Sequence, residues 1–120
     1  MNLNHLDLQV SDVPAAAAFF ARYFDLERHS KATSPAIAIL GDAAGFTLVL
    51  QRLKDDAQTY PDGFHIGFYV DSVAEVHARR ERIAADHAVG EIITNNRGTM
   101  FYCRGPNGIV SEVNCRSRVP

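Results

Sequence analysis

Residues 3–10, LNHLDLQV, alternate between apolar and polar side chains. A period of two is typical of a β-strand with one buried and one polar face. His5 and Asp7 share the polar face, and the leucines and valine between and after them face the core. The chain therefore opens with a predicted strand that presents ionisable groups on one side only.

The next segment, DVPAAAAFFARYF, carries the start signals of a helix. Asp12 is a favourable N-cap residue, and Pro14 is tolerated in the first helical turn. The pattern predicts a helix over residues 13–24 with one apolar face, which consists of Val13, Ala16, Ala17, Phe20 and Phe24. Three short strands are predicted to follow, within 26–33, 36–41 and 46–53.

The second half of the chain repeats this order of elements. It begins with a strand over 64–70 and continues with a helix within 71–85, capped by Asp71 or Ser72. The predicted helical stripe consists of Val73, Val76, Arg80 and Ile83. Three strands are then predicted within 90–94, 99–104 and 109–114, the last two joined by a tight turn at Asn107-Gly108.

The two halves are internally related at an offset of 60 residues. The matched pairs are His5/His65, Leu6/Ile66, Leu8/Phe68, Val10/Val70 and Val13/Val73. Residues 54–63, KDDAQTYPDG, have the composition of a loop between the halves. A single βαβββ unit of this length would bury too little apolar surface, so we expect the two units to pack side by side or to enclose a cavity.

Composition restricts the possible partners. The length of 120 residues suits one core, and 47% hydrophobic with 22% charged residues is typical of a globular protein. A net charge of −2 argues against binding to nucleic acid or to an anionic membrane, so we predict a small-molecule partner. The first residues lack the features of a signal peptide, which predicts a cytoplasmic protein. Cys103 and Cys115 are expected to be reduced, unless their strands are neighbours and permit a disulfide.

Three residues are candidate metal ligands. The repeat places His5 and His65 at equivalent positions on the polar faces of their strands, and Glu112 is the acid of the last predicted strand. A carboxylate with apolar neighbours needs a partner when it is buried. Two imidazoles and one carboxylate suit a divalent Fe, Mn, Zn, Co or Ni ion and leave coordination positions open.

The motifs NHLDLQVSDV, GFHIGFYVDSV and FYCRGPNGIVSEV together resemble those of the vicinal oxygen chelate superfamily, which includes glyoxalase I, fosfomycin-resistance enzymes, extradiol dioxygenases and bleomycin-resistance proteins. The resemblance runs along the whole chain. It implies an α+β fold in which two βαβββ modules, about 1–55 and 62–117, pair into a cup-shaped mixed sheet around a cavity. Residues 1–120 would then form a single domain of this type.

The resemblance also implies that His5, His65 and Glu112 bind the metal. Glyoxalase I-like members have a fourth ligand on the last strand of the first module, where this chain has Val49. The departure favours the three-ligand branch. Tyr102 matches a substrate-contacting tyrosine of the fosfomycin enzymes, but EIITNNRG replaces their phosphonate-binding stretch and Asp7 replaces a threonine.

A metal-dependent lyase, isomerase, transferase or dioxygenase is therefore expected, acting on a small molecule that chelates the ion through oxygens. Asp7 and Tyr102 are the candidate catalytic residues, Asp7 as a general base or as a partner of an imidazole. Tyr69 and Arg97 are candidate substrate-binding residues. The alternative is a bleomycin-resistance-like binding protein without catalysis. By analogy with other small members, we expect a homodimer with sites shared between chains.

Overall fold

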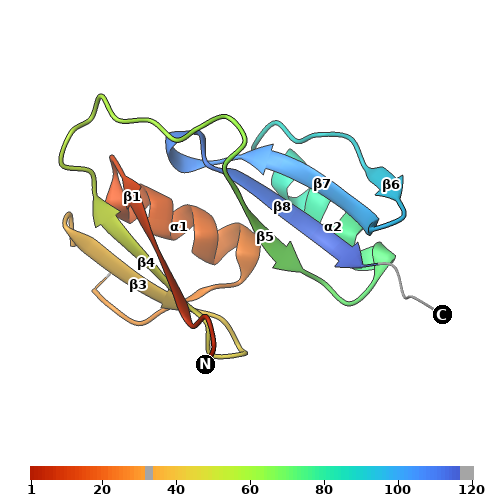
Figure 1. Ribbon diagram of the computed structural model, residues 1–120, viewed down its shortest axis with the longest axis horizontal. Helices are drawn as coiled ribbons and strands as arrows, with labels where there is room; N and C mark the ends of the chain where they lie inside the picture. Colours follow the sequence, from red (N-terminus) through yellow and green to blue (C-terminus); the bar gives the residue numbers. More distant parts are fainter. Residues whose placement is uncertain (32–33, 117–120) are drawn as a thin grey trace. The chain divides into compact units, whose positions relative to one another are not determined.

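The computed structural model describes residues 1–31 and 34–116, which form two compact units, Met1–Thr59 and Tyr60–Pro120. Each unit contains one helix and one four-stranded mixed sheet (Figure 1). The predicted α+β class and the βαβββ order of both halves are confirmed. The boundary between the units falls within the predicted loop segment 54–63, in which the structure has no helix or strand.

Unit 1 contains the elements β1 (His5–Val10), α1 (Val13–Phe24), β2 (Glu27–Arg28), β3 (Ile37–Gly41) and β4 (Thr47–Arg52). Its sheet order is β1-β4-β3-β2, with β1 parallel to β4 and the other pairs antiparallel. The predicted strand within 26–33 is reduced to the two residues of β2, and residues 32–33 lie outside the described part of the chain. Beyond β2 the ladder is replaced by a side-chain contact, because the Ser30 hydroxyl oxygen accepts a hydrogen bond from the Ile39 amide at 2.8 Å.

Helix α1 begins and ends at the predicted residues. The Asp12 carboxylate accepts a hydrogen bond from the Ala15 amide at 3.0 Å, and Asp25 ends the helix in the left-handed conformation with φ 55°. The helix packs on β2, β3 and β4. Its buried face differs from the prediction in that Phe19 and Tyr23 are buried as well, whereas Phe24 is only half-buried.

Unit 2 contains β5 (His65–Tyr69), α2 (Val73–Ala84), β6 (Ile93–Asn95), β7 (Gly98–Arg104), a 3₁₀ turn (Pro106–Gly108) and β8 (Val110–Arg116). Its sheet order is β5-β8-β7-β6, with β5 parallel to β8. Helix α2 packs on β7 and β8 (Figure 1). The described part of the chain has no helix that is both long and apolar enough to cross a bilayer.

The offset of 60 residues holds for the backbone of the first strand and the helix of each unit. Helices α1 and α2 have equal lengths and bounds that differ by 60, and each is capped by the side chain of the preceding residue. The last strands are related by an offset of 63, because His5 pairs with Thr47 in unit 1 and His65 pairs with Val110 in unit 2. Position 49 is therefore equivalent to position 112, as the sequence comparison predicted.

Helix α2 differs from α1 in how it contacts its sheet. Val76 and Ile83 of the predicted stripe are fully buried. Val73 is 47% exposed, although its counterpart Val13 is completely buried, so the prediction of a buried Val73 is wrong. Only two apolar side chains of the stripe anchor α2, because charged residues occupy much of the rest of this helix.

Three described residues of unit 2 have positive φ values. Asn107 and Gly108 have φ values of 56° and 71° and turn the chain between β7 and β8, as predicted. Gly98 has φ +139° at the start of β7, where an added Cβ would overlap the Cys115 carbonyl oxygen. The hairpin between β7 and β8 therefore depends on glycine at its open end.

Candidate functional site

Paired strands of unit 2 place the candidate residues on one sheet face. Residues that face each other across a ladder share a face, and the register joins Gly67 to Glu112 and Glu112 to Tyr102. His65 belongs to the preceding row, opposite Val110. The other face of β8 carries the buried residues Ser111 and Val113, and Ile109 just before the strand is buried as well. Alternation along β8 therefore separates the core from a polar face, as the sequence predicted.

The imidazole of His65 is oriented by the backbone before β5. Its Nδ1 atom lies 3.0 Å from the Gly63 carbonyl oxygen, which can only accept a hydrogen bond. Nδ1 therefore carries the proton, and the lone pair of the neutral ring is on Nε2. The ring also packs edge-on against Tyr102, with centroids 6.0 Å apart. This arrangement presents Nε2 as a potential metal ligand.

The carboxylate of Glu112 is held by a donor on each oxygen. The Tyr102 hydroxyl donates to Oε1 at 2.5 Å, and Asn114 Nδ2 donates to Oε2 at 2.9 Å. The hydrogen bond to Glu112 is the main reason that the Tyr102 pKa is raised, burial adds to it, and the charge of Arg97 acts in the opposite direction. Tyr102 is therefore protonated at neutral pH and acts as a donor.

Glycine at position 67 leaves space beside this carboxylate. A Cβ at Gly67 would lie 3.7 Å from Glu112 Oε2 and 3.7 Å from Asn114 Nδ2. Such contacts are of ordinary van der Waals length, so a Cβ would lie directly against both groups. The glycine keeps Oε2 accessible from the β5 side.

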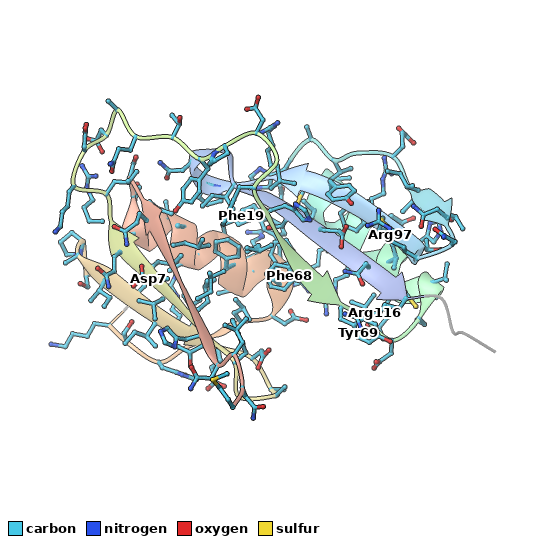
Figure 2. The ribbon with its side chains drawn as sticks, viewed as in Figure 1. Asp7, Phe19, Phe68, Tyr69, Arg97 and Arg116 are labelled. Atoms are coloured by element: carbon cyan, nitrogen blue, oxygen red, sulfur yellow. The ribbon has the colours of Figure 1, made fainter. Side chains whose placement is uncertain are left out.

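Tyr69 and Arg97 occupy different parts of unit 2. Tyr69 is 58% exposed at the end of β5, opposite Asn114, and the Arg116 guanidinium lies 5.7 Å from its ring centroid (Figure 2). Arg97 lies in the turn before β7, where its backbone amide donates to Asn95 Oδ1 at 2.8 Å. Its charge is close enough to influence Tyr102.

In unit 1 the imidazole of His5 has a similar orientation. Its Nδ1 atom lies 2.7 Å from Asn4 Oδ1, so the accepting oxygen again assigns the proton to Nδ1. His5 is exposed on β1 opposite Thr47. Both predicted histidine ligands thus have Nδ1 engaged with an oxygen and Nε2 as the lone-pair nitrogen.

Asp7 lies two residues beyond His5 on the same face of β1. Its Oδ1 accepts from Gln9 Nε2 at 2.8 Å, and its Oδ2 accepts from Gln51 Nε2 at 2.7 Å. The Nδ1 partner of His5 is Asn4 rather than Asp7. Neither glutamine was identified from the sequence, although alternation along β1 and β4 places both on this face.

The donor set is chemically suited to a divalent metal. Neutral imidazoles with a fixed Nδ1 proton and a hydrogen-bonded carboxylate are the usual form of such ligands. Within residues 1–31 and 34–116, neither unit by itself contains three His, Cys, Asp or Glu side chains that lie close enough together to hold a metal ion. His5 belongs to unit 1, whereas His65 and Glu112 belong to unit 2.

The two cysteines, Cys103 and Cys115, are not among the candidate site residues. Both are free, as expected. Their strands are neighbours, but Cys103 pairs with Ser111 and Cys115 pairs with Thr99, a separation of four ladder positions or about 13 Å. This register excludes an intrachain disulfide between them. Burial raises the pKa of the Cys103 thiol to about 11.

Comparisons with known proteins extend over the whole chain. A possible glyoxalase from Bacillus cereus is 33% identical, with 96% of this chain and 99% of that chain covered and a TM-score of 0.82. A lactoylglutathione lyase from Agrobacterium tumefaciens is 23% identical, with 95% and 92% covered and a TM-score of 0.78. A fosfomycin resistance protein from Listeria monocytogenes is 22% identical, with 98% and 94% covered and a TM-score of 0.79.

The last two similarities concern the fold alone, because their identities are low. None of the curated proteins compared matches the chain. The family model of the Glyoxalase/Bleomycin resistance protein/Dioxygenase superfamily matches residues 2–113. The chain therefore belongs to the glyoxalase/bleomycin resistance protein/dioxygenase superfamily.

Proposed function

We propose that this protein is a metal-dependent enzyme that acts on a small molecule able to chelate a divalent ion through two oxygens. His5, His65 and Glu112 are the proposed ligands, and the ion is Fe, Mn, Zn, Ni or Co. The observation that carries the proposal is the matched hydrogen bonding of the two histidines, whose Nδ1 atoms meet Asn4 Oδ1 and the Gly63 carbonyl. This arrangement leaves Nε2 of each histidine as the nitrogen able to bind an ion, which is the form that metal-binding histidines usually have.

A bound divalent ion supplies Lewis-acid stabilisation of negative charge on the substrate oxygens. Around it, Tyr102 and Asn114 keep the Glu112 carboxylate in one orientation through their donors to Oε1 and Oε2. Tyr102 is protonated, and rotation of its hydroxyl would redirect its single proton from Glu112 to a substrate oxygen. Both Asp7 oxygens accept hydrogen bonds from glutamine amides, which fixes the orientation of this carboxyl group.

Two further residues of unit 2 are proposed to contact the substrate. Arg97 carries a positive charge within electrostatic reach of Tyr102, and it suits an anionic substrate group. Tyr69 presents an exposed ring on the same face as His65. We assign the reaction to the range covered by the superfamily, namely a lyase, isomerase, transferase or dioxygenase reaction.

Three expectations from the sequence complete the proposal. The chain is proposed to form one domain over residues 1–120, to assemble as a homodimer and to work in the cytoplasm. The two free cysteines suit a reducing compartment. In a homodimer, His5 of one chain is able to serve a site with His65 and Glu112 of its partner.

The test is the metal content of protein purified without added metal or chelator, measured by elemental analysis. The comparison uses His5→Ala, His65→Ala and Glu112→Ala, with His77→Ala as the control, because His77 is an exposed histidine on α2. We expect near-stoichiometric metal in the wild type and in the control, and its loss in the three ligand variants. Iron would indicate dioxygen chemistry, whereas Ni, Zn or Mn would indicate isomerase or transferase chemistry.

Protein that binds no metal, even after incubation with Fe, Mn, Zn, Co and Ni, would contradict the proposal. The function would then be that of a small-molecule or drug-binding protein without catalysis. Its ligand would be sought by thermal-shift screening, since a ligand that binds only the folded state raises the melting temperature.

A further inference from the structure

The two units place a carboxylate in the same row of their sheets but on different strands. In unit 2 the row pairs Gly67 on β5 with Glu112 on β8. In unit 1 the equivalent row pairs Asp7 on β1 with Val49 on β4. The acid is on the last strand in one unit and on the first strand in the other. Paired residues of neighbouring strands share a face, so both carboxylates belong to the histidine-bearing face of their unit.

Each carboxylate also has an amide from the equivalent position of the last strand. Gln51 donates to Asp7 Oδ2 at 2.7 Å, and Asn114 donates to Glu112 Oε2 at 2.9 Å. Positions 51 and 114 correspond at the offset of 63, because each lies two residues beyond the row of the acid. A second donor binds the other oxygen of each carboxylate, namely Gln9 at Asp7 Oδ1 and Tyr102 at Glu112 Oε1.

The donors leave the histidine side of Asp7 available. Gln9 and Gln51 form the row beyond Asp7, and His5 lies in the row before it. Both donors therefore come from the row on the other side of Asp7 from His5. Each carboxylate oxygen has two lone pairs, so one acceptor position per oxygen remains after these hydrogen bonds.

His5 and Asp7 have a spacing that suits two ligands of one ion. Residues at i and i+2 of a strand lie about 7 Å apart on the same face. An imidazole Nε2 and a carboxylate oxygen are able to converge across this distance on an ion at roughly 2.0–2.2 Å from each. The fixed Nδ1 proton of His5 already leaves Nε2 as the ligating nitrogen.

We propose that Asp7 is a metal ligand, contributed together with His5 by unit 1. This inference rests on the proposed function and extends its ligand set from His5, His65 and Glu112 to four residues. Unit 1 has Val49 at the position of Glu112, and in this proposal Asp7, which pairs with Val49 across the ladder, provides the carboxylate instead. Two carboxylates neutralise a divalent ion, and a six-coordinate ion then retains two positions for a bidentate oxygen substrate.

The test uses Co²⁺ as the probe, added to protein stripped of metal with a chelator. The visible absorption band of bound Co²⁺ gives both the dissociation constant and, through its intensity and position, the ligand field. Asp7→Asn removes the charge with little change of shape. Asp7→Glu keeps the carboxylate, and Asp56→Asn is the control, since Asp56 is an exposed acid of unit 1 paired with Arg52. Circular dichroism establishes that each variant is folded.

We expect Asp7→Asn to weaken Co²⁺ binding by more than about 100-fold, beyond the roughly 10–100-fold loss typical of a residue that only orients a ligand. Its absorption band is expected to change, whereas Asp7→Glu stays nearer to the wild type and Asp56→Asn is unaltered. Weaker binding with an unchanged band, or wild-type binding by Asp7→Asn, would overturn the assignment and leave a three-ligand centre. A wild-type protein that does not bind Co²⁺ would instead overturn the proposed function itself.

Discussion

The Tyr102 hydroxyl donates a hydrogen bond of 2.5 Å to Glu112 Oε1 across the ladder between β7 and β8. Tyr102 lies directly opposite Glu112, so the strand register alone brings the two groups together. We expect Tyr102→Phe to keep the fold, with a loss in the free energy of unfolding of about 1 kcal/mol, because one hydrogen bond at a half-buried site is removed.

Metal binding is expected to respond more strongly to Tyr102→Phe than stability does. Loss of the donor leaves the Glu112 carboxylate less well oriented, and we expect a roughly 10–100-fold weaker metal affinity in titrations. Tyr60→Phe is the matched control, since Tyr60 stacks on Phe64 rather than on the acid. Equal affinities of Tyr102→Phe and wild type would show that the hydrogen bond does not support the ligand.

The alkaline titration of Tyr102 reports on the same contact. Its pKa is raised above 10.0 in the folded state, chiefly by the hydrogen bond to Glu112. A group whose pKa is raised on folding adds to the free energy of unfolding. This contribution is fully present at pH values below the pKa of the unfolded state, and it is lost as pH rises through the pKa of the folded state. Phenolate absorbance is therefore expected to show a late component, absent from Tyr102→Phe and shifted to lower pH in Glu112→Gln. An unshifted component in Glu112→Gln would contradict the assignment of the cause.

The two cysteines are expected to differ in reactivity. Burial raises the pKa of Cys103 to about 11, while Cys115 is only half-buried. At pH 8 a thiol with that pKa is ionised to about one part in a thousand, and the thiolate is the reactive species. We expect iodoacetamide to modify Cys115 first, with Cys103 labelled only after denaturation, as measured by peptide mass spectrometry. Comparable labelling rates in the native state would be inconsistent with the packing of β7.

Gly98 and Gly45 form a matched pair that separates the cost of a positive φ from the cost of a steric clash. Both have positive φ, +139° and +91°, but a Cβ would overlap the Cys115 carbonyl at Gly98 and meet nothing within 4 Å at Gly45. We expect Gly45→Ala to cost about 1 kcal/mol of unfolding free energy through φ alone. Gly98→Ala is expected to cost at least about 3 kcal/mol, since the clash adds to the strain. Urea unfolding measures both, and similar losses would refute the steric argument.

The helices were the most predictable elements because their limits have local chemical causes. Asp12 and Pro14 define the start of α1, and Ser72 defines that of α2. Short strands were less predictable. The segment within 90–94 forms a strand only from Ile93 and extends to Asn95, because its pairing is set by β7 rather than by its own pattern.

Part of the site was also accessible to sequence reasoning. The alternation of β8 placed Glu112 on the polar face, and the repeat paired His5 with His65. The same alternation placed Asn114 beside Glu112 on that face, but its amide contact requires a side-chain conformation that no pattern contains. The Nδ1 partners Asn4 and Gly63 lie just before their strands, where the path of the backbone decides the hydrogen bond.

His5, His65 and Glu112 are proposed to bind one divalent ion. The most direct measurement is anomalous diffraction from a crystal grown with Co²⁺, which locates the ion independently of any assumed ligand. We predict an ion about 2.0–2.2 Å from Nε2 of both histidines and from a Glu112 oxygen. An ion held through Nδ1 of either histidine, or bound away from these three residues, would contradict it.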